Sequence, residues 1–287
     1  MSDELAVVLC VDVAYARYAF VTIQSVLDNL DVGTYVKFYI FHEKINESCI
    51  FMGQTLFNTK FSSIEFVDLS PLIGGRRFNE LHHWNRTVYY SGLIPEILRG
   101  RHRYALYLDA DVLVCHDVTE LPGLMDISKG VGAVAGYPLV SYQIDNDPVY
   151  SGMNRQDYER EIIGLQGNQK RFNSGVMLFN LDVIDKDFTR KYLSAAERHF
   201  AYTDEDVANF LLKGRVCYLD LAWNVMLDYD RSIFAIDAND PHLKYCLQHP
   251  KILHYLNNPK PWDGLKGSFA DLYRQKLAYI DLLISEI

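Results

Sequence analysis

Two aspartates stand in the middle of an apolar stretch, RYALYLDADVLVC, at residues 103–115. Asp109 and Asp111 flank Ala110 in what otherwise reads as a buried strand. Burying an unpaired carboxylate costs on the order of several kcal/mol, so such a pair is expected where a strand leaves the core or around a bound cation. Both interpretations indicate a binding site.

The D-x-D pattern alone is weak evidence, because it occurs five times. Asp204 opens a helical segment, where acids complement the helix dipole and need no further role. Only the Asp109 pair follows a strongly apolar strand, and open α/β sheets bind ligands at the carboxyl ends of their strands. The first residues of the five matches are Asp109, Asp145, Asp185, Asp204 and Asp228.

A second group of candidate ligands lies in ILHYLNNPKPW, where His254 ends an apolar run and Lys260 follows in a turn. A lone histidine at a strand end is usually a structural, hydrogen-bonded residue. Beside two carboxylates, however, a neutral imidazole can complete an Asp/Asp/His site for Mn²⁺ or Mg²⁺, and a lysine suits a phosphate. These parts together describe a clamp for a metal and a diphosphate.

Short apolar runs alternate with helical patterns through the first half of the chain, which predicts βαβ units and an α/β fold. The sheet should be mainly parallel and flanked by helices. Strands are expected at residues 5–12, 35–43, 63–69 and 103–115, and helices at residues 18–30, 47–57 and 86–98.

The second half has a mixed pattern, with strands expected at residues 131–136, 172–181 and 252–256. Residues 137–171 are polar and too long for an ordinary connection, so they are expected to form a substrate-covering lid or insertion. Its tyrosines, Tyr137, Tyr142, Tyr150 and Tyr158, could stack on rings of a substrate, but ordinary packing is at least as good an interpretation. We expect one domain over residues 1–262 and a helical tail over residues 263–287, which should pack on the domain or a partner chain rather than on a membrane surface.

The overall composition argues against several classes of function. A formal net charge of -9 disfavours nucleic-acid binding, which needs a basic surface. The five cysteines are far apart and form no C-x-x-C pair, which favours reduced thiols and a cytoplasmic location. No signal peptide and no transmembrane segment is expected.

Four ordered motifs, YLDADVLV, FNSGVMLFN, TDEDVANFLLKG and HYLNNPKPW, resemble those of the retaining glycosyltransferases of family 8, over roughly residues 5 to 262. That family includes bacterial lipopolysaccharide galactosyl- and glucosyltransferases and the glycogenins. The resemblance implies a Rossmann-like GT-A fold, a UDP-sugar donor and Mn²⁺, with Mg²⁺ as the alternative. It also implies that Asp109, Asp111 and His254 are the metal ligands.

The resemblance assigns further residues by position. Asp12 and Tyr15 match the residues that bind uracil, and Lys260 matches the lysine on the diphosphate. Asn173 and the Asp204–Glu205 pair match residues around the transferred sugar. We also expect Ala110 and Asn257 to contact the donor.

This chain departs from the family pattern at three positions. Ala14 replaces an asparagine of the uracil site, and Ser91 replaces an arginine, for which Arg86 could substitute. Glu205 replaces the usual glutamine. It could act directly near the anomeric carbon, as a nucleophile or by stabilising an oxocarbenium-like transition state. In the alternative, TDED only caps a helix, with Thr203 as N-cap and Gly214 as the stop.

The activity that the resemblance implies is metal-dependent, retaining transfer of a hexose from a UDP-sugar to a hydroxyl acceptor, for which a saccharide is expected. Residues 137–171 would then be an acceptor-side insertion, whose tyrosines could stack on sugar rings. Three alternatives remain: a nucleotide-sugar-binding protein with little turnover, a glycogenin-like self-glucosylating protein, and a metal-dependent phosphohydrolase. The last would need a richer cluster of acids and histidines for two metals.

Overall fold

A computed structural model of the chain describes residues 4–80, 86–136, 144, 147–227, 240–256 and 258–287. A seven-stranded sheet lies at its centre, in the order β3-β2-β1-β4-β7-β6-β8. These strands are β1 Leu5–Cys10, β2 Val36–His42, β3 Ser62–Asp68, β4 Tyr104–Leu108, β6 Val131–Ala135, β7 Phe172–Asn180 and β8 Val216–Leu219.

The pairing in this sheet is mixed but mainly parallel, as the alternating pattern predicted. The pairs β3–β2, β2–β1, β1–β4 and β6–β8 are parallel, whereas β7 runs antiparallel to both β4 and β6. In β1, Leu5, Val7 and Leu9 face one hydrophobic core while Ala6 and Val8 face the other. Both faces are therefore buried, which is why the strand reads as an unbroken apolar run.

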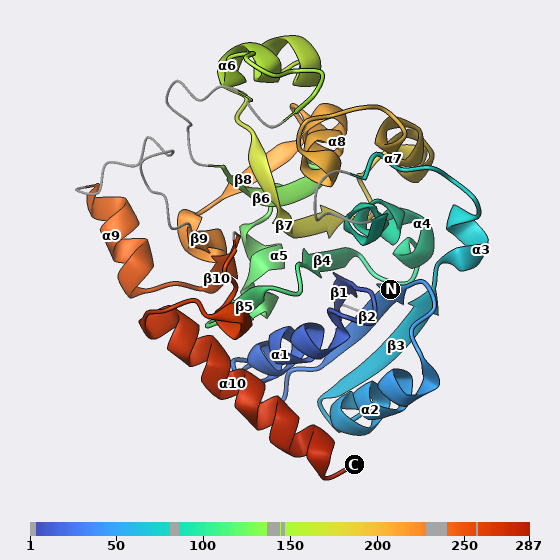
Figure 1. The fold of residues 1–287 in the computed structure, drawn as a ribbon, viewed down its shortest axis with the longest axis vertical. Coiled ribbons are helices and arrows are strands. Elements are labelled where there is room, and N and C mark those ends of the chain that lie inside the picture. Colours follow the sequence, from blue (N-terminus) through green and yellow to red (C-terminus); the bar gives the residue numbers. More distant parts are fainter. Residues whose placement is uncertain (1–3, 81–85, 137–143, 145–146, 228–239, 257) are drawn as a thin grey trace.

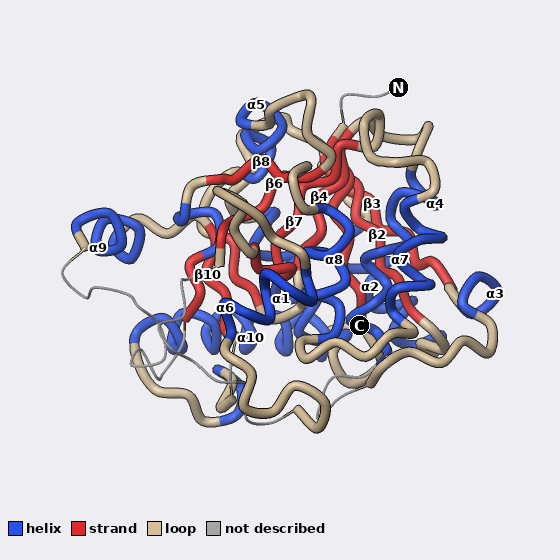
Figure 2. The backbone as a smooth tube through the Cα atoms, turned by 90° about the horizontal axis from the view of Figure 1, so that it is seen from above, coloured by secondary structure: helices blue, strands red, loops and turns tan. Residues whose placement is uncertain are grey.

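Helices cover the two faces of the sheet (Figures 1 and 2). The helices α1 Ala16–Leu27, α2 Glu47–Phe57 and α10 Ser268–Ser285 pack into one core. The 3₁₀ helix η1 Arg86–Leu93 and the helices α4 Ile94–Leu98, α7 Phe188–Ala196 and α8 Thr203–Leu212 pack into the other. Shorter elements are α3 Ser70–Ile73, α5 Leu121–Leu124, α6 Arg155–Tyr158, α9 Pro241–Gln248, the 3₁₀ helices η2 Val118–Glu120, η4 Leu221–Asn224 and η5 Pro261–Asp263, and the π-helix η3 Glu159–Ile163.

A second, smaller sheet has three strands. It consists of β5 Val112–Val114, β10 Ile252–Tyr255 and β9 Val225–Leu227, in the order β5-β10-β9. The expected single strand over residues 103–115 is therefore wrong: β4 and β5 belong to different sheets, and the Asp109 pair lies where the chain crosses between them. A second of the five D-x-D matches also follows a strand, because the three-residue β9 ends directly before Asp228.

The C-terminal helix α10 packs along α1 (Figure 1). Tyr273, Leu277 and Ile280 are buried in the core, and ion pairs join Arg17 to Asp281 and Lys276 to Asp28. The tail therefore packs on the domain. No helix of the described residues has both the length and the apolar character needed to cross a bilayer.

The expected insertion lies partly outside the described residues, including Tyr137 and Tyr142. Of its other tyrosines, Tyr158 is fully buried and donates a hydrogen bond to Asp206, so it is a packing residue. Tyr150 is partly buried and stacks on His199.

Candidate active site

The candidate site forms where four elements meet: the end of β4, the start of β7, the strand β10 and the first turn of α8. The backbone N–H of Asp109 donates to the Gly175 carbonyl at 2.9 Å, which fixes the turn after β4 to β7. His254 pairs with Val112 across the small sheet. Residues from distant parts of the sequence are thus brought together by strand pairing.

Asp109, Asp111 and His254 form a cluster, here called the Asp109 cluster, whose ligand atoms all lie within 4.8 Å of one another. Nε2 of His254 is 3.5 Å from Oδ2 of Asp109 and 3.4 Å from Oδ1 of Asp111. Each aspartate gives its other oxygen to a protein donor: Tyr107 O–H to Asp109 at 2.5 Å, and Lys260 Nζ to Asp111 at 2.6 Å. One oxygen per aspartate therefore faces the common centre.

Burial and charge act differently on the two carboxyls. Burial, together with the neighbouring Asp111, raises the pKa of Asp109. Burial also favours the neutral form of Asp111, but Lys260 and His254 outweigh it and hold the pKa of Asp111 below its ordinary value. Asp111 is thus a firmly ionised ligand candidate.

Lys260 is buried and gives its three ammonium protons to protein acceptors. Besides Asp111, they are the carbonyls of Tyr255 at 2.5 Å and Leu256 at 2.8 Å. This holds the only positive side chain of the predicted clamp directly beside the Asp109 cluster. Its contact with a diphosphate stays a prediction.

Gly175 lies against the Asp109 cluster, where its backbone closely approaches two of the ligand candidates. A Cβ at this position would be 2.2 Å from Cε1 of His254 and 2.6 Å from Oδ2 of Asp109. Both distances are far below van der Waals contact, so only glycine fits here without displacing a ligand candidate.

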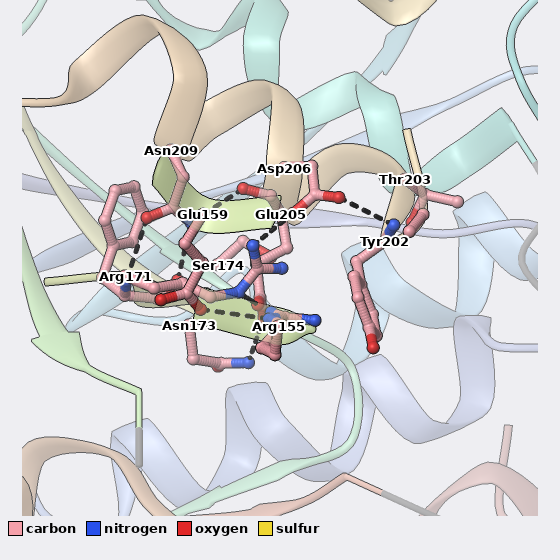
Figure 3. A network of polar contacts seen from close by, with 12 residues as sticks. Arg155, Glu159, Arg171, Asn173, Ser174, Tyr202, Thr203, Glu205, Asp206 and Asn209 are labelled. Carbon is pink, nitrogen blue, oxygen red and sulfur yellow. Dashed lines mark hydrogen bonds and ion pairs between the residues drawn. The ribbon is translucent and has the colours of Figure 1, made fainter. Parts of the chain in front are cut away.

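A second set of polar contacts, drawn in Figure 3, is here called the Glu205 network. Glu205 accepts from Nε of Arg171 at 2.5 Å with one carboxylate oxygen and from Nδ2 of Asn173 at 2.9 Å with the other. Arg171 also pairs with the fully buried Asp206. Burial disfavours the charged guanidinium, but Asp206 and Glu205 raise the pKa of Arg171 overall.

Asn224 joins the two regions, and sequence reasoning missed it. Its Nδ2 donates to Oδ1 of Asn173 at 2.9 Å, and its Oδ1 lies 3.1 Å from Nδ1 of His254. This amide orientation assigns the proton to Nδ1, which leaves the lone pair on Nε2 directed at Asp109 and Asp111. Two carboxylates facing a lone pair repel it unless a cation lies between them, so the arrangement fits a metal site.

Asp204 lies at the junction of the two regions. It accepts hydrogen bonds from Ser174 Oγ at 2.9 Å and Thr203 Oγ1 at 3.0 Å. Burial, with the nearby Asp109 and Glu205, raises the pKa of Asp204 to about 7. It is therefore a group that can change its charge near neutral pH.

Thr203 does not cap α8, contrary to the simple capping interpretation. It is the first residue of the helix, with a φ of 35°, and the preceding Tyr202 N–H is satisfied by Asp206 Oδ2 at 2.8 Å. Gly214, with a φ of 76°, follows the helix end as predicted.

The other residues predicted to bind the donor differ in their exposure and in their contacts. Tyr15 is 38% exposed, its backbone N–H donates to Oδ1 of Asp12 at 3.0 Å, and burial and the charge of Asp111 raise its pKa. Ala110 is buried, and its carbonyl accepts from Thr22 Oγ1 at 3.3 Å.

Arg86 and Asn257 are not brought to the cluster by any described contact. Among the described residues, Arg86 pairs with Glu43 at 3.0 Å and its guanidinium lies over the ring of Phe78. Asn257 lies outside the described residues. Donor contacts of both stay predictions.

The fold is that of the GT-A type of glycosyltransferase. The chain belongs to glycosyl transferase family 8, whose sequence model matches residues 6–266. This confirms the family that the four motifs indicated.

Individual relatives agree with this assignment. A lipopolysaccharide 1,2-glucosyltransferase of Escherichia coli (strain K12) is 27% identical over 183 residues, covering 62% of this chain and 50% of the relative. The structure is similar to the apo WbbM bifunctional glycosyltransferase, with a TM-score of 0.81, 20% identity, and coverage of 97% of this chain and 50% of that one. The chain thus spans about half the length of both proteins.

The galactosyltransferase LgtC is similar along almost its whole length. A structure of its active-site glutamine-to-glutamate variant has a TM-score of 0.72, 25% identity, and coverage of 96% of this chain and 95% of LgtC. Its complex with donor and acceptor sugar analogues has a TM-score of 0.69 and 22% identity, with the same coverage.

Proposed function

We propose that this protein transfers a hexose from a UDP-sugar to a hydroxyl acceptor, with retention at the anomeric carbon and in a metal-dependent manner. The observation that carries the proposal is the Asp109 cluster, in which two carboxylate oxygens and an imidazole nitrogen face one centre. Lys260 lies directly beside it.

The donor atoms of the Asp109 cluster suit a hard or borderline divalent cation, with Mn²⁺ preferred and Mg²⁺ possible. Asp109, Asp111 and His254 would hold the ion, and Asn224 would keep the imidazole in the tautomer that binds it. When bound, such an ion neutralises charge on a diphosphate leaving group. Lys260 adds a second positive charge for that group.

The nucleotide would lie over Tyr15. Its partly exposed ring can stack on uracil, and Asp12 fixes the backbone of the same turn. Arg86, Ala110 and Asn257 complete the proposed donor contacts.

The transferred sugar would lie against Asn173, Asp204 and Glu205. Both oxygens of Glu205 accept hydrogen bonds, which lowers its nucleophilicity, so we assign it to electrostatic stabilisation of an oxocarbenium-like transition state. The leaving phosphate then guides attack by the acceptor on the same face, and no enzyme–sugar bond forms.

We place the activity in polysaccharide or lipopolysaccharide synthesis in the cytoplasm. LgtC binds donor and acceptor sugar analogues, and the curated relative named above is a lipopolysaccharide glucosyltransferase. The five cysteines are all free, which fits a reducing compartment.

Incubation with a panel of UDP-hexoses, Mn²⁺ and saccharide acceptors tests the proposal. We expect UDP release with one donor, a product that keeps the α configuration by NMR, and loss of both on chelation. UDP binding without turnover would indicate the binding-protein alternative. Stepwise hexose additions to the chain by mass spectrometry would indicate self-glucosylation, and release of UDP from no donor would contradict the proposal.

A further inference from the structure

A second group of metal-type ligands lies at the edge of the molecule, around α9 (Figures 1 and 2). Among the described residues, only Asp220, His242 and Cys246 match the Asp109 cluster in bringing three such side chains within 4.8 Å. This set is here called the Asp220 cluster. Its residues play no part in the proposed transfer reaction.

Local structure explains why the three side chains meet. His242 and Cys246 are four residues apart on α9, so they lie on one face of the helix, one turn apart. Asp240 caps this helix by accepting from the His242 N–H at 2.7 Å. Asp220 caps the neighbouring 3₁₀ helix η4, where its Oδ1 accepts from the Ala222 N–H at 2.9 Å.

The distances between the ligand atoms are close to those of a tetrahedral zinc site, with Cys246 and His242 facing different oxygens of the Asp220 carboxylate. Bond lengths of about 2.3 Å for Zn–S and about 2.0 Å for Zn–N and Zn–O give ligand-to-ligand distances of about 3.3 to 3.6 Å. Here Sγ of Cys246 is 3.7 Å from Nε2 of His242 and 3.8 Å from Oδ1 of Asp220. Nε2 of His242 is 3.2 Å from Oδ2 of Asp220.

The same atoms do not form a nucleophile–base–acid triad. In a triad the acid and the nucleophile contact opposite nitrogens of the imidazole. Here the thiol and the carboxylate both face Nε2, and Cys246 is fully buried, so no substrate can reach its sulfur. A thiol, an imidazole nitrogen and a carboxylate gathered within 4.8 Å of one another are instead a set of groups that can surround an ion.

We propose that Asp220, His242 and Cys246 bind a zinc ion that links α9 to η4. The thiol gives up its proton to solvent as the ion binds, and water takes the fourth position. The side chains of His242 and Asp220 are 55% and 51% exposed, so the ion can enter from solvent. The thiolate selects zinc, whereas the oxygen-rich Asp109 cluster suits Mn²⁺ or Mg²⁺.

The proposed site also supports the active site from a distance. Asp220 is the N-cap of η4, and η4 ends at Asn224, which orients His254. Fixing Asp220 to α9 would therefore hold the segment that carries Asn224.

Metal analysis and cobalt substitution of the full chain test the proposal. After dialysis against a weak chelator, we expect one zinc per wild-type chain. Replacing it with Co²⁺ should give thiolate-to-cobalt charge-transfer absorption in the near ultraviolet. Cys246→Ser and His242→Gln should lose both signals.

Three controls make the result specific. Asp220→Asn keeps the acceptor for Ala222 but should weaken zinc binding. Cys217→Ser, which removes a cysteine outside the cluster, should keep the signals, and so should Asp111→Asn, which alters only the other cluster. His242 is on the surface, so its variant should fold even if Cys246→Ser does not.

Zinc-free wild-type protein with no cobalt–thiolate band would overturn the proposal. Equal zinc in His242→Gln and wild type would also overturn it. Neither result depends on sugar transfer, so this site and the proposed function can fail separately.

Discussion

The Asp109 cluster and the Glu205 network lie next to each other, but they differ in whether their carboxylate oxygens are free to bind a further group. In the cluster, Asp109 and Asp111 each leave one oxygen facing a common centre with Nε2 of His254. In the network, both oxygens of Glu205 already accept hydrogen bonds from Arg171 and Asn173. The first arrangement leaves oxygens that can bind a cation, whereas in the second both oxygens of Glu205 are held by protein donors.

This difference indicates that the two regions have different roles. The cluster is suited to bind a metal and the diphosphate, and the network is suited to hold polar groups rigidly beside the sugar. Asn224 and Gly175 lie between the two regions, so changes there should affect the cluster through geometry alone.

Among the variants that test this difference, Gly175→Ala should have the largest effect on activity. Its Cβ would overlap His254 and Asp109, and a displacement of about 1 Å in a catalytic site can cost about a hundredfold in rate. We expect a loss of that order in kcat/KM and weaker Mn²⁺ binding by titration. Gly123→Ala, where the added methyl group meets open space, is the matched control; equal activity of the two variants would show that the site tolerates the overlap.

Asn224→Ala removes the bond that orients His254 without touching a carboxylate. Loss of such a partner typically lowers metal affinity or activity about 10- to 100-fold. Raising the Mn²⁺ concentration should recover most of the rate. The exposed Asn168→Ala serves as control, and an unchanged apparent Mn²⁺ affinity in Asn224→Ala would separate Asn224 from the metal site.

Glu205→Gln should have a smaller effect, because a stabilising carboxylate can be partly replaced by an amide. The amide keeps one acceptor but turns a donor toward Arg171 or Asn173, so one hydrogen bond is lost, at a cost of about 1 to 3 kcal/mol. We expect kcat within about tenfold of wild type and a lower Tm. A collapse of kcat, with a glycosyl–enzyme adduct by mass spectrometry, would instead make Glu205 the nucleophile.

Asp204→Asn should give the smallest effect, and it should appear in stability. The pKa of Asp204 is raised to about 7, above its unfolded value of about 3.9, so the folded state binds its proton more tightly. Stability from this group is full below the unfolded pKa and is lost as pH rises through about 7.

The asparagine variant does not titrate, so it should gain a few degrees of Tm over wild type at pH 8 with chelator present, and less at pH 5. The same Tm difference at both values would show that Asp204 ionises normally. Adding Mn²⁺ should reduce the gain at pH 8, because a nearby cation favours the ionised form.

The sequence predicted much of the first half of the fold, because hydrophobic periodicity dominates there. The expected helix at residues 47–57 matches α2, whose N-cap Asn46 accepts from the Cys49 N–H. The break between β4 and β5 was not predictable, because both segments are apolar and only pairing with β10 separates them. β9 has only three residues, too few for a periodic pattern.

Among site residues, the ligand candidates were found because they lie in motifs, and the structure brings Asp109, Asp111, His254 and Lys260 together. Asn224 and Arg171 were missed, since an asparagine in L-A-W-N and an arginine before F-N-S-G carry no local signal. Their roles depend on long-range contacts. The Asp220 cluster was missed for the same reason: its two segments are 22 residues apart and meet only through packing of α9 on η4.

The central claim, a metal-dependent UDP-sugar site at the Asp109 cluster, is tested most directly by calorimetric titration of UDP. The account predicts tight UDP binding by wild type with Mn²⁺, and binding at least tenfold weaker, or about 1.4 kcal/mol, when Mn²⁺ is omitted. In Asp111→Asn, with its fold confirmed by circular dichroism, Mn²⁺ should no longer strengthen binding. Equal UDP affinity with and without Mn²⁺ in wild type, or an undiminished effect of Mn²⁺ in Asp111→Asn, would contradict the account.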